Sequence, residues 1–311
     1  MTPRVIALAI AAACCHVLSF GQTPTRPPSP TTSKPLTQTV LKPVYQPGRS
    51  YVVTLDSKID GPQTGKVSVS YGLDIVPTSS PAAREWSFRV ARVAMSVTAD
   101  GETAAADSEK LPPREELFAS KTPEGDVGQT VWGMKLIGGR VRLGEDGLVT
   151  ERRGDAQILL DAIPKLSEVE AQVMADVGTL DMSTVVESVN RYLPGRAVSI
   201  GQTWHGKHKT YIAGKLLAET INCTLDSVAA TSTGRVAVIS IMGRVEGEDE
   251  RMNRTFQGKA RYSLDQPSDV TVELLEKVLG GTNDLTVTVR PKAEATTTPR
   301  PSSTGKSAGG S

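Results

Sequence analysis

Cysteine and histidine are scarce in this chain, which has three of each among its 311 residues. Thiol chemistry and most transition-metal sites depend on these side chains. Only Cys223, His205 and His208 lie beyond the first 21 residues. A single cysteine cannot form an internal disulfide, so the body of the chain must be stabilised by an apolar core.

An excess of charge of either sign is also missing. The 35 Lys and Arg residues stand against 34 Asp and Glu residues, which leaves a formal net charge of +1. Proteins that bind nucleic acids carry a basic field to offset the phosphates. We therefore expect no nucleic-acid partner.

The first residues have the pattern of an export signal. Arg4 gives a positive start, an apolar run follows from Val5 to Leu18, and Ser19-Phe20-Gly21 is a small-x-small cleavage site. A membrane-spanning helix needs about 20 apolar residues, and this run is shorter. The pattern predicts a secreted or periplasmic protein that loses residues 1–21 and has no transmembrane span once mature.

A lipid anchor is the alternative at this end of the chain. Cys14 and Cys15 follow a run of alanines and have the position of a lipidated cysteine. The leucine that usually stands three residues before such a cysteine is absent. The soluble product is therefore the favoured prediction.

Two polar segments flank the remaining sequence. Residues 22–48 are rich in Pro, Thr and Ser, and residues 291–311 have no large apolar side chain. Such compositions cannot offset the entropy of ordering. We expect a disordered linker, a single β-rich domain over residues 49–290, and a disordered tail.

Strict alternation of apolar and polar residues dominates the domain. Residues 66–75 alternate throughout, which predicts a strand with one buried face. In the next run the apolar phase switches after Val90, which predicts a bulge near Ala91-Arg92, and Asp100-Gly101 then predicts a turn. Similar strand patterns occur at Trp132-Met134-Leu136, at 141–143 before an Asp146-Gly147 turn, at 236–241, 260–264, 270–274 and 285–289.

Helical spacing appears only in the middle of the chain. Apolar residues recur at steps of three and four between Leu166 and Leu193, and Pro194-Gly195 ends the pattern. We expect helices over about residues 155–193. Strands, then helices, then strands predict an α+β fold in which a curved, mainly antiparallel sheet is covered by a central helical segment.

A search for catalytic residues finds little. A Gly-x-Ser-x-Gly match at 305–309 and a Ser-x-x-Lys match at 303–306 both lie in the polar tail, where no packed shell can hold a nucleophile. His205 and His208 should point to opposite faces of a strand, and Cys223 shares an apolar face with Ile221 and Leu225. We predict a protein that is not an enzyme, with no catalytic residue, metal or cofactor.

Acidic residues gather at 246–250, between two expected strands. The run lacks the Asp-x-Asp-x-Asp-Gly spacing of a calcium loop. A solvated hairpin loop is the favoured interpretation.

Several short segments resemble a family of bacterial exported proteins known only as a domain of unknown function (six-two-six-three). The matching segments are Leu193-Pro194 with Val198-Ser199-Ile200-Gly201-Gln202-Thr203-Trp204, Asp107-Ser108, Leu143-Gly144-Glu145-Asp146-Gly147-Leu148-Val149, and Tyr262-Ser263-Leu264-Asp265. At Gln202 the family pattern has an acidic residue. The resemblance implies export and a β-rich fold and brings no catalytic residues.

Three classes of function remain open. The favoured one is an envelope protein that binds a lipid, another hydrophobic ligand or an envelope partner in an apolar groove between helices and sheet, lined by Leu136, Val173, Val186 and Tyr262. The second is a structural or adaptor protein with a filled core. The third is a hydrolase without a recognisable motif.

Overall fold

The computed structural model describes most of the expected domain. The described ranges are 38–61, 65–78, 84–163, 166–212, 215–247, 253–265, 269–278 and 281–292. The expected export signal with Cys14 and Cys15, most of the expected linker, and residues 293–311 of the tail lie outside them. Part of the acidic segment, residues 248–250, lies outside them too.

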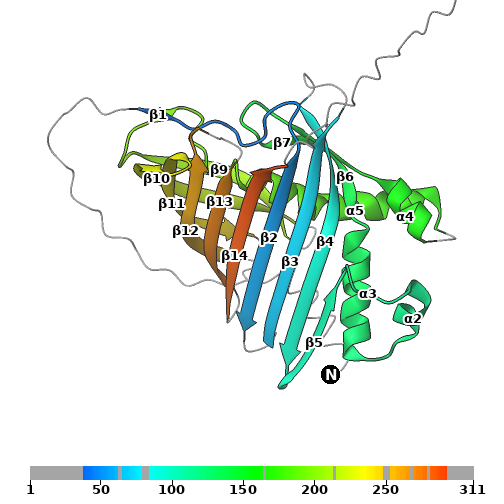
Figure 1. Ribbon diagram of the computed structural model, residues 1–311. Coiled ribbons are helices and arrows are strands. Elements are labelled where there is room, and N and C mark those ends of the chain that lie inside the picture. The colour runs from blue at the N-terminus through cyan, green and yellow to red at the C-terminus, as the bar shows by residue number, and fades with distance from the viewer. Residues whose placement is uncertain are drawn as a thin grey trace, which may run out of the picture.

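A twelve-stranded antiparallel sheet forms most of the molecule. In sheet order its strands are β7 (Val149–Gly154), β6 (Gly138–Leu143), β4 (Glu85–Ala99), β3 (Gly65–Pro77), β2 (Tyr51–Gly61), β14 (Gly281–Pro291), β13 (Val270–Val278), β12 (Arg254–Ser263), β11 (Gly234–Glu246), β10 (Lys215–Thr231) and β9 (Thr203–Ile212), with β5 (Glu102–Asp107) paired to β4. Figure 1 shows β2 and β14, from opposite ends of the chain, side by side at the centre. The predicted mainly antiparallel α+β fold, with sequence-distant strands in one sheet, is confirmed.

The predicted bulge in β4 is present. Gly72 pairs with Arg92 and Leu73 pairs with Val90, so Ala91 is the extra residue. Because of this insertion, the apolar residues on both sides of it, from Trp86 to Val97, all reach the buried face. The Asp100-Gly101 turn follows with positive φ at both residues.

Helix α5 (Glu168–Ser188) spans the opening of the sheet. It contacts β6 and β7 at one edge and β9 at the opposite edge, and Figure 1 shows it running across one face of the strands. A single helix can contact both edges only because the sheet bends around it. The edge strands β7 and β9 are not paired with each other, so the sheet stays open.

Small residues let α5 lie close to the sheet. Ala171, Ala175 and Thr179 form its buried stripe, and a Cβ added at Gly154 of β7 would lie 2.2 Å from the carbonyl carbon of Ala175. The helix begins at a capping box, in which Ser167 and Glu170 satisfy each other's backbone N–H groups. A shorter helix, α4 (Ala156–Ala162), packs beside it.

One predicted strand is wrong. Trp132 and Met134 lie in helix α3 (Pro123–Lys135), and Leu136 is its C-terminal cap. Thr122 accepts a hydrogen bond from Gly125 N and Pro123 occupies the first turn, which together start a helix. The buried residues Val127 and Val131 are four positions apart, as on one face of a helix. The alternating apolar residues at 132–136 lie in and next to this helix and do not form a strand. Helix α2 (Arg114–Ala119) precedes α3.

The ordered part begins before residue 49. Strand β1 (Thr39–Val40) pairs with β8 (Ala197–Val198), and Leu41, Val44 and Tyr45 are buried in the core. These three large side chains can bury apolar area that the preceding Pro and Thr residues cannot. The expected linker therefore does not extend to residue 48. In the part of the chain that the structure describes, no helix has the length and apolar character needed to cross a membrane.

Candidate ligand-binding cavity

A cavity of about 320 Å³ lies between α5 and the inner face of the sheet, the face that carries Val69 and Val287. This volume is within the range of small-molecule sites. Its apolar lining residues are Leu55, Val69, Tyr71, Met134, Ile137, Met182, Val185, Tyr192, Val245, Phe256, Leu274, Leu285 and Val287. Its polar ones are Ser57, Thr184, Ser188, Arg191, Glu219, Arg254, Glu276 and Asn283.

The centre of the inner face is not filled by the protein. Leu55 of β2 and Tyr71 of β3 are directly paired and only half-buried, although Val53 and Leu73 beside them are fully buried. A fully packed interior would cover all four side chains alike. The half-buried pair marks apolar surface that faces open space in the cavity.

A buried ion-pair cluster forms part of the cavity wall. Arg191, three residues beyond α5, donates from Nη1 to Glu219 Oε2 at 2.8 Å and from Nη2 to Glu187 Oε1 at 2.8 Å. The side chains of Arg191 and Glu219 are each 5% exposed, and that of Glu187 is 17% exposed. Ion pairs buried this deeply carry a large desolvation cost, which close geometry must offset.

A second polar chain lies on β2, β12, β13 and β14. Ser57 Oγ donates to Asn283 Oδ1 at 2.8 Å, and Asn283 Nδ2 donates to Glu276 Oε2 at 2.8 Å. Arg254 Nη1 lies 3.7 Å from the same Glu276 oxygen. The cavity therefore has an apolar part and a hydrogen-bonded charged part.

The burial of Glu219 shifts its pKa. Burial raises the pKa of Glu219 above its ordinary value; the charge of Arg191 opposes this shift, and the charges of Glu276 and Glu187 add to it. Burial acts to lower the pKa of Arg191, but the nearby carboxylates, Glu219 first, more than offset it, so the guanidinium stays charged.

The four residues expected to line the groove lie elsewhere. Val186 and Tyr262 are packed into the main core, and the Tyr262 hydroxyl donates to Val189 O. Leu136 packs in a small cluster with Leu159 and Ala175, and Val173 is 58% exposed on the outer side of α5. The cavity lies between helix and sheet as expected, but chain neighbours such as Met134, Ile137 and Val185 line it.

The helical spacing of α5 explains the error for Val173. Val169, Val173 and Val177 form one apolar stripe, which is exposed, and Met182 and Val186 belong to a different, buried stripe. Periodicity shows that an apolar stripe exists but not whether the sheet covers it. Alanine and threonine occupy the covered side because the backbones approach closely there.

The charged residues of the cavity were missed, although the sequence held a signal for them. Glu219 lies in β10 on the same alternating phase as Leu217, Ile221 and Cys223, and Glu276 shares the phase of Leu274. A charge on the apolar phase of a strand indicates a buried polar site.

Cys223, His205 and His208 lie on the paired strands β10 and β9 but in different surroundings. Burial, reinforced by the charge of Glu219, raises the pKa of the Cys223 thiol to about 12. His205 is exposed and contacts Asn222, whereas His208 points inward, and burial lowers its pKa. No three His, Cys, Asp or Glu side chains among the described residues are placed to hold a metal ion together.

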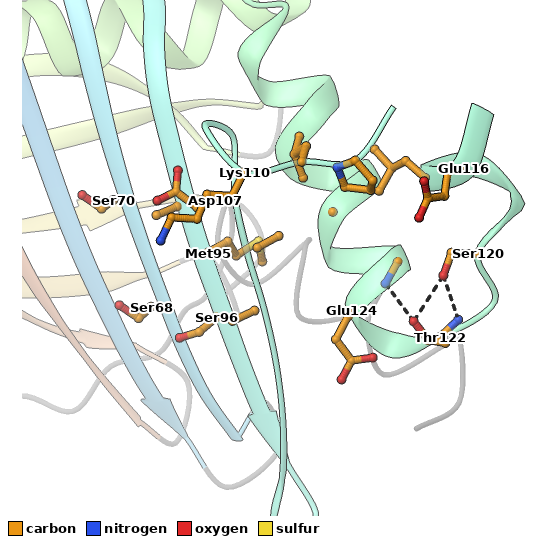
Figure 2. Close-up of a pocket in the computed structure, with 18 residues that line it drawn as sticks. Ser68, Ser70, Met95, Ser96, Asp107, Lys110, Glu116, Ser120, Thr122 and Glu124 are labelled. Carbon is orange, nitrogen blue, oxygen red and sulfur yellow. Dashed lines mark hydrogen bonds between the residues drawn. The ribbon is translucent and has the colours of Figure 1, made fainter. Parts of the chain in front are cut away.

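A larger hollow of about 660 Å³ lies outside the core, where β4 and β5 face α2 and α3 (Figure 2). Its charged residues Lys110, Glu116 and Glu124 are exposed, and the hydrogen bonds between Ser120, Thr122 and Gly125 cap α3. Asp107 is paired with Arg92 at 2.6 Å, and this hydrogen bond lowers its pKa. These polar groups are already solvated or paired, so the inner cavity is the better candidate site.

Comparisons with known proteins give distant similarities only. No protein-family model matches the chain, and no curated protein matches its sequence. DynF from the dynemicin biosynthesis pathway of Micromonospora chersina is similar over 90% of this chain and 97% of its own, with 9% identity and a TM-score of 0.20. A LolA superfamily protein from Nitrosomonas europaea is similar over 81% and 90%, with 7% identity and a TM-score of 0.18. Scores this low do not define a family or a role.

Proposed function

We propose that this chain is an exported, non-enzymatic protein of the cell envelope that binds a hydrophobic ligand between α5 and the sheet. The observation that carries the proposal is the cavity of about 320 Å³ with its half-buried Leu55–Tyr71 pair. A structural or adaptor protein with a filled core would not be expected to contain a cavity of this size. The resemblance to exported proteins of unknown function supports the same assignment of compartment.

Two valines on α5 offer a matched test. Val185 lines the cavity, whereas Val173 is exposed on the outer side of the same helix. We expect Val185→Trp to place its indole in the cavity and to weaken binding of the neutral fluorescent probe N-phenyl-1-naphthylamine about tenfold or more, since each 1.4 kcal/mol of lost contact is tenfold in affinity. Val173→Trp should leave binding unchanged.

Probe fluorescence and urea unfolding should be measured on the purified domain and both variants. The indole enters open space, so we expect Val185→Trp to cost less than the 1–3 kcal/mol typical of overpacking, about 1 kcal/mol or less. Equal probe binding by the two variants, or no binding by the unmodified protein, would contradict the proposed function.

A further inference from the structure

Two carboxylate oxygens in the cavity lack donors. Glu219 Oε2 accepts from Arg191, and Glu276 Oε2 accepts from Asn283. No residue that the structure describes donates to Oε1 of either side chain, and neither oxygen is sealed by surrounding atoms. Both side chains line the cavity, so it presents two free acceptors beside its apolar walls.

The Nη atoms of Arg191 are not available to a ligand. Both Nη atoms of Arg191 already donate to carboxylates at 2.8 Å, whereas the Nε atoms of Arg191 and Arg254 are buried without a hydrogen-bond partner among the described residues. Arg254 lies beside Glu276 on the wall. An anionic headgroup at Arg191 would therefore compete with Glu219 and Glu187. One at Arg254 would lie beside the Glu276 carboxylate.

The charges around Glu219 do not balance. Arg191 is the cation that acts on Glu219, and Glu187 and Glu276 are further carboxylates that act on it. His208 pairs with Glu219 across β9 and β10, and burial lowers the pKa of His208, which disfavours its charged form. Counting Arg254 as the partner of Glu276, three carboxylates face two guanidiniums, and an uncompensated buried charge is costly.

We infer that the cavity binds amphiphiles with an apolar body and a single protonated amine, whose N–H groups donate to the free oxygens of Glu219 and Glu276. The inference rests on the proposed function, because the apolar body must occupy the same cavity. An ammonium group supplies three donors and one positive charge, which matches the two free acceptors and the missing cation.

Three ten-carbon compounds that differ only in the headgroup provide the test. Decylamine, decanol and decanoate should each be titrated against the protein loaded with N-phenyl-1-naphthylamine, and displacement followed by fluorescence at neutral pH. We expect decylamine to displace the probe at a concentration about tenfold lower than decanol, and decanoate to be the weakest, since charge-assisted hydrogen bonds are about twice as strong as neutral ones.

Substitutions assign the preference to the two carboxylates. Glu276→Gln and Glu219→Gln should each reduce the preference for the amine, and Glu273→Gln is the control because Glu273 lies on the outer face of the same strand β13 and pairs with Arg261. Urea unfolding identifies any variant that fails to fold, and the other variant then provides the test.

The outcomes separate the two claims. Equal displacement by amine and alcohol, or the strongest displacement by decanoate, would overturn the inference while leaving hydrophobic binding intact. Failure of the probe to bind the unmodified protein would refute the proposed function itself.

Discussion

Glu219 links burial, charge and binding at the level of a single residue. It lies on the apolar phase of β10, with one guanidinium and two other carboxylates around it. Because burial raises its pKa, the site takes up a proton more readily than an exposed glutamate. A bound amine and a bound proton therefore compete for the same carboxylate.

This competition predicts pH-dependent binding. A carboxyl with a raised pKa is neutralised as the pH falls through that value, while an alkylamine stays charged, so the affinity for decylamine should fall as the pH is lowered from neutral toward the ordinary pKa of glutamate. The affinity for decanol should stay nearly constant over this range. Isothermal titration at several pH values measures both, and Glu219→Gln should flatten the amine profile.

Cys223 gives a second prediction at the residue level. Burial raises the pKa of its thiol to about 12, so the native thiol stays protonated at pH 8 and should react with an aromatic disulfide reagent at least about a hundredfold more slowly than in urea. Because the native thiol holds its proton more tightly than the unfolded one, burial of the protonated thiol stabilises the fold below the ordinary thiol pKa. This stabilisation is lost as the pH rises from that value toward 12. Equal rates in the native and unfolded states would contradict the burial.

At the level of elements, the contact between α5 and β7 sets the geometry of the cavity. Gly154 allows the helix backbone to approach the strand, and the outward stripe Val169, Val173 and Val177 is left exposed by this orientation. The inner stripe then places Met182 and Val185 over the cavity.

Two glycine-to-alanine substitutions test this contact with opposite signs. Gly154→Ala would place a Cβ 2.2 Å from the Ala175 backbone, and we expect it to lower the free energy of unfolding by about 1–3 kcal/mol. Gly133→Ala lies in α3 with no atom within 4 Å of the added Cβ, and should raise stability by up to about 1 kcal/mol. Urea unfolding of both variants checks the contrast, and equal effects would rule out a close contact at Gly154.

At the level of the whole molecule, the open sheet and the C-terminal half of α5 share the main core, a smaller cluster lies between α4 and α5, and strands from both ends of the chain meet at β2 and β14. The described chain begins near β1, which pairs with β8 in a separate two-stranded sheet, and ends next to β2, where Lys292 N donates to Ser50 O.

Processing of the first 21 residues is the prediction at this scale. When the full-length chain is expressed with an intact export pathway, N-terminal sequencing of the product should begin at Gln22. A lipid-modified product beginning at Cys14 or Cys15 would favour the anchored alternative. A product that retains Met1 would contradict export by this signal.

The sequence by itself determined the features that depend on neighbouring residues. Alternation predicted most strands, the phase switch predicted the Ala91 bulge, and Asp-Gly pairs predicted two turns, because each is encoded within a few positions. It misassigned α3 because Trp132, Met134 and Leu136 have strand spacing inside a helix that is specified by its cap at Thr122.

Tertiary structure alone decided which side of α5 is buried and where the cavity lies. Arg191 meets Glu219 across 28 positions, and Ser57 meets Asn283 across 226. Such contacts depend on the register of distant strands and on the bend of the sheet around α5, and no local pattern contains either. The candidate site therefore consists of residues that the sequence marked only as charges on apolar strand phases.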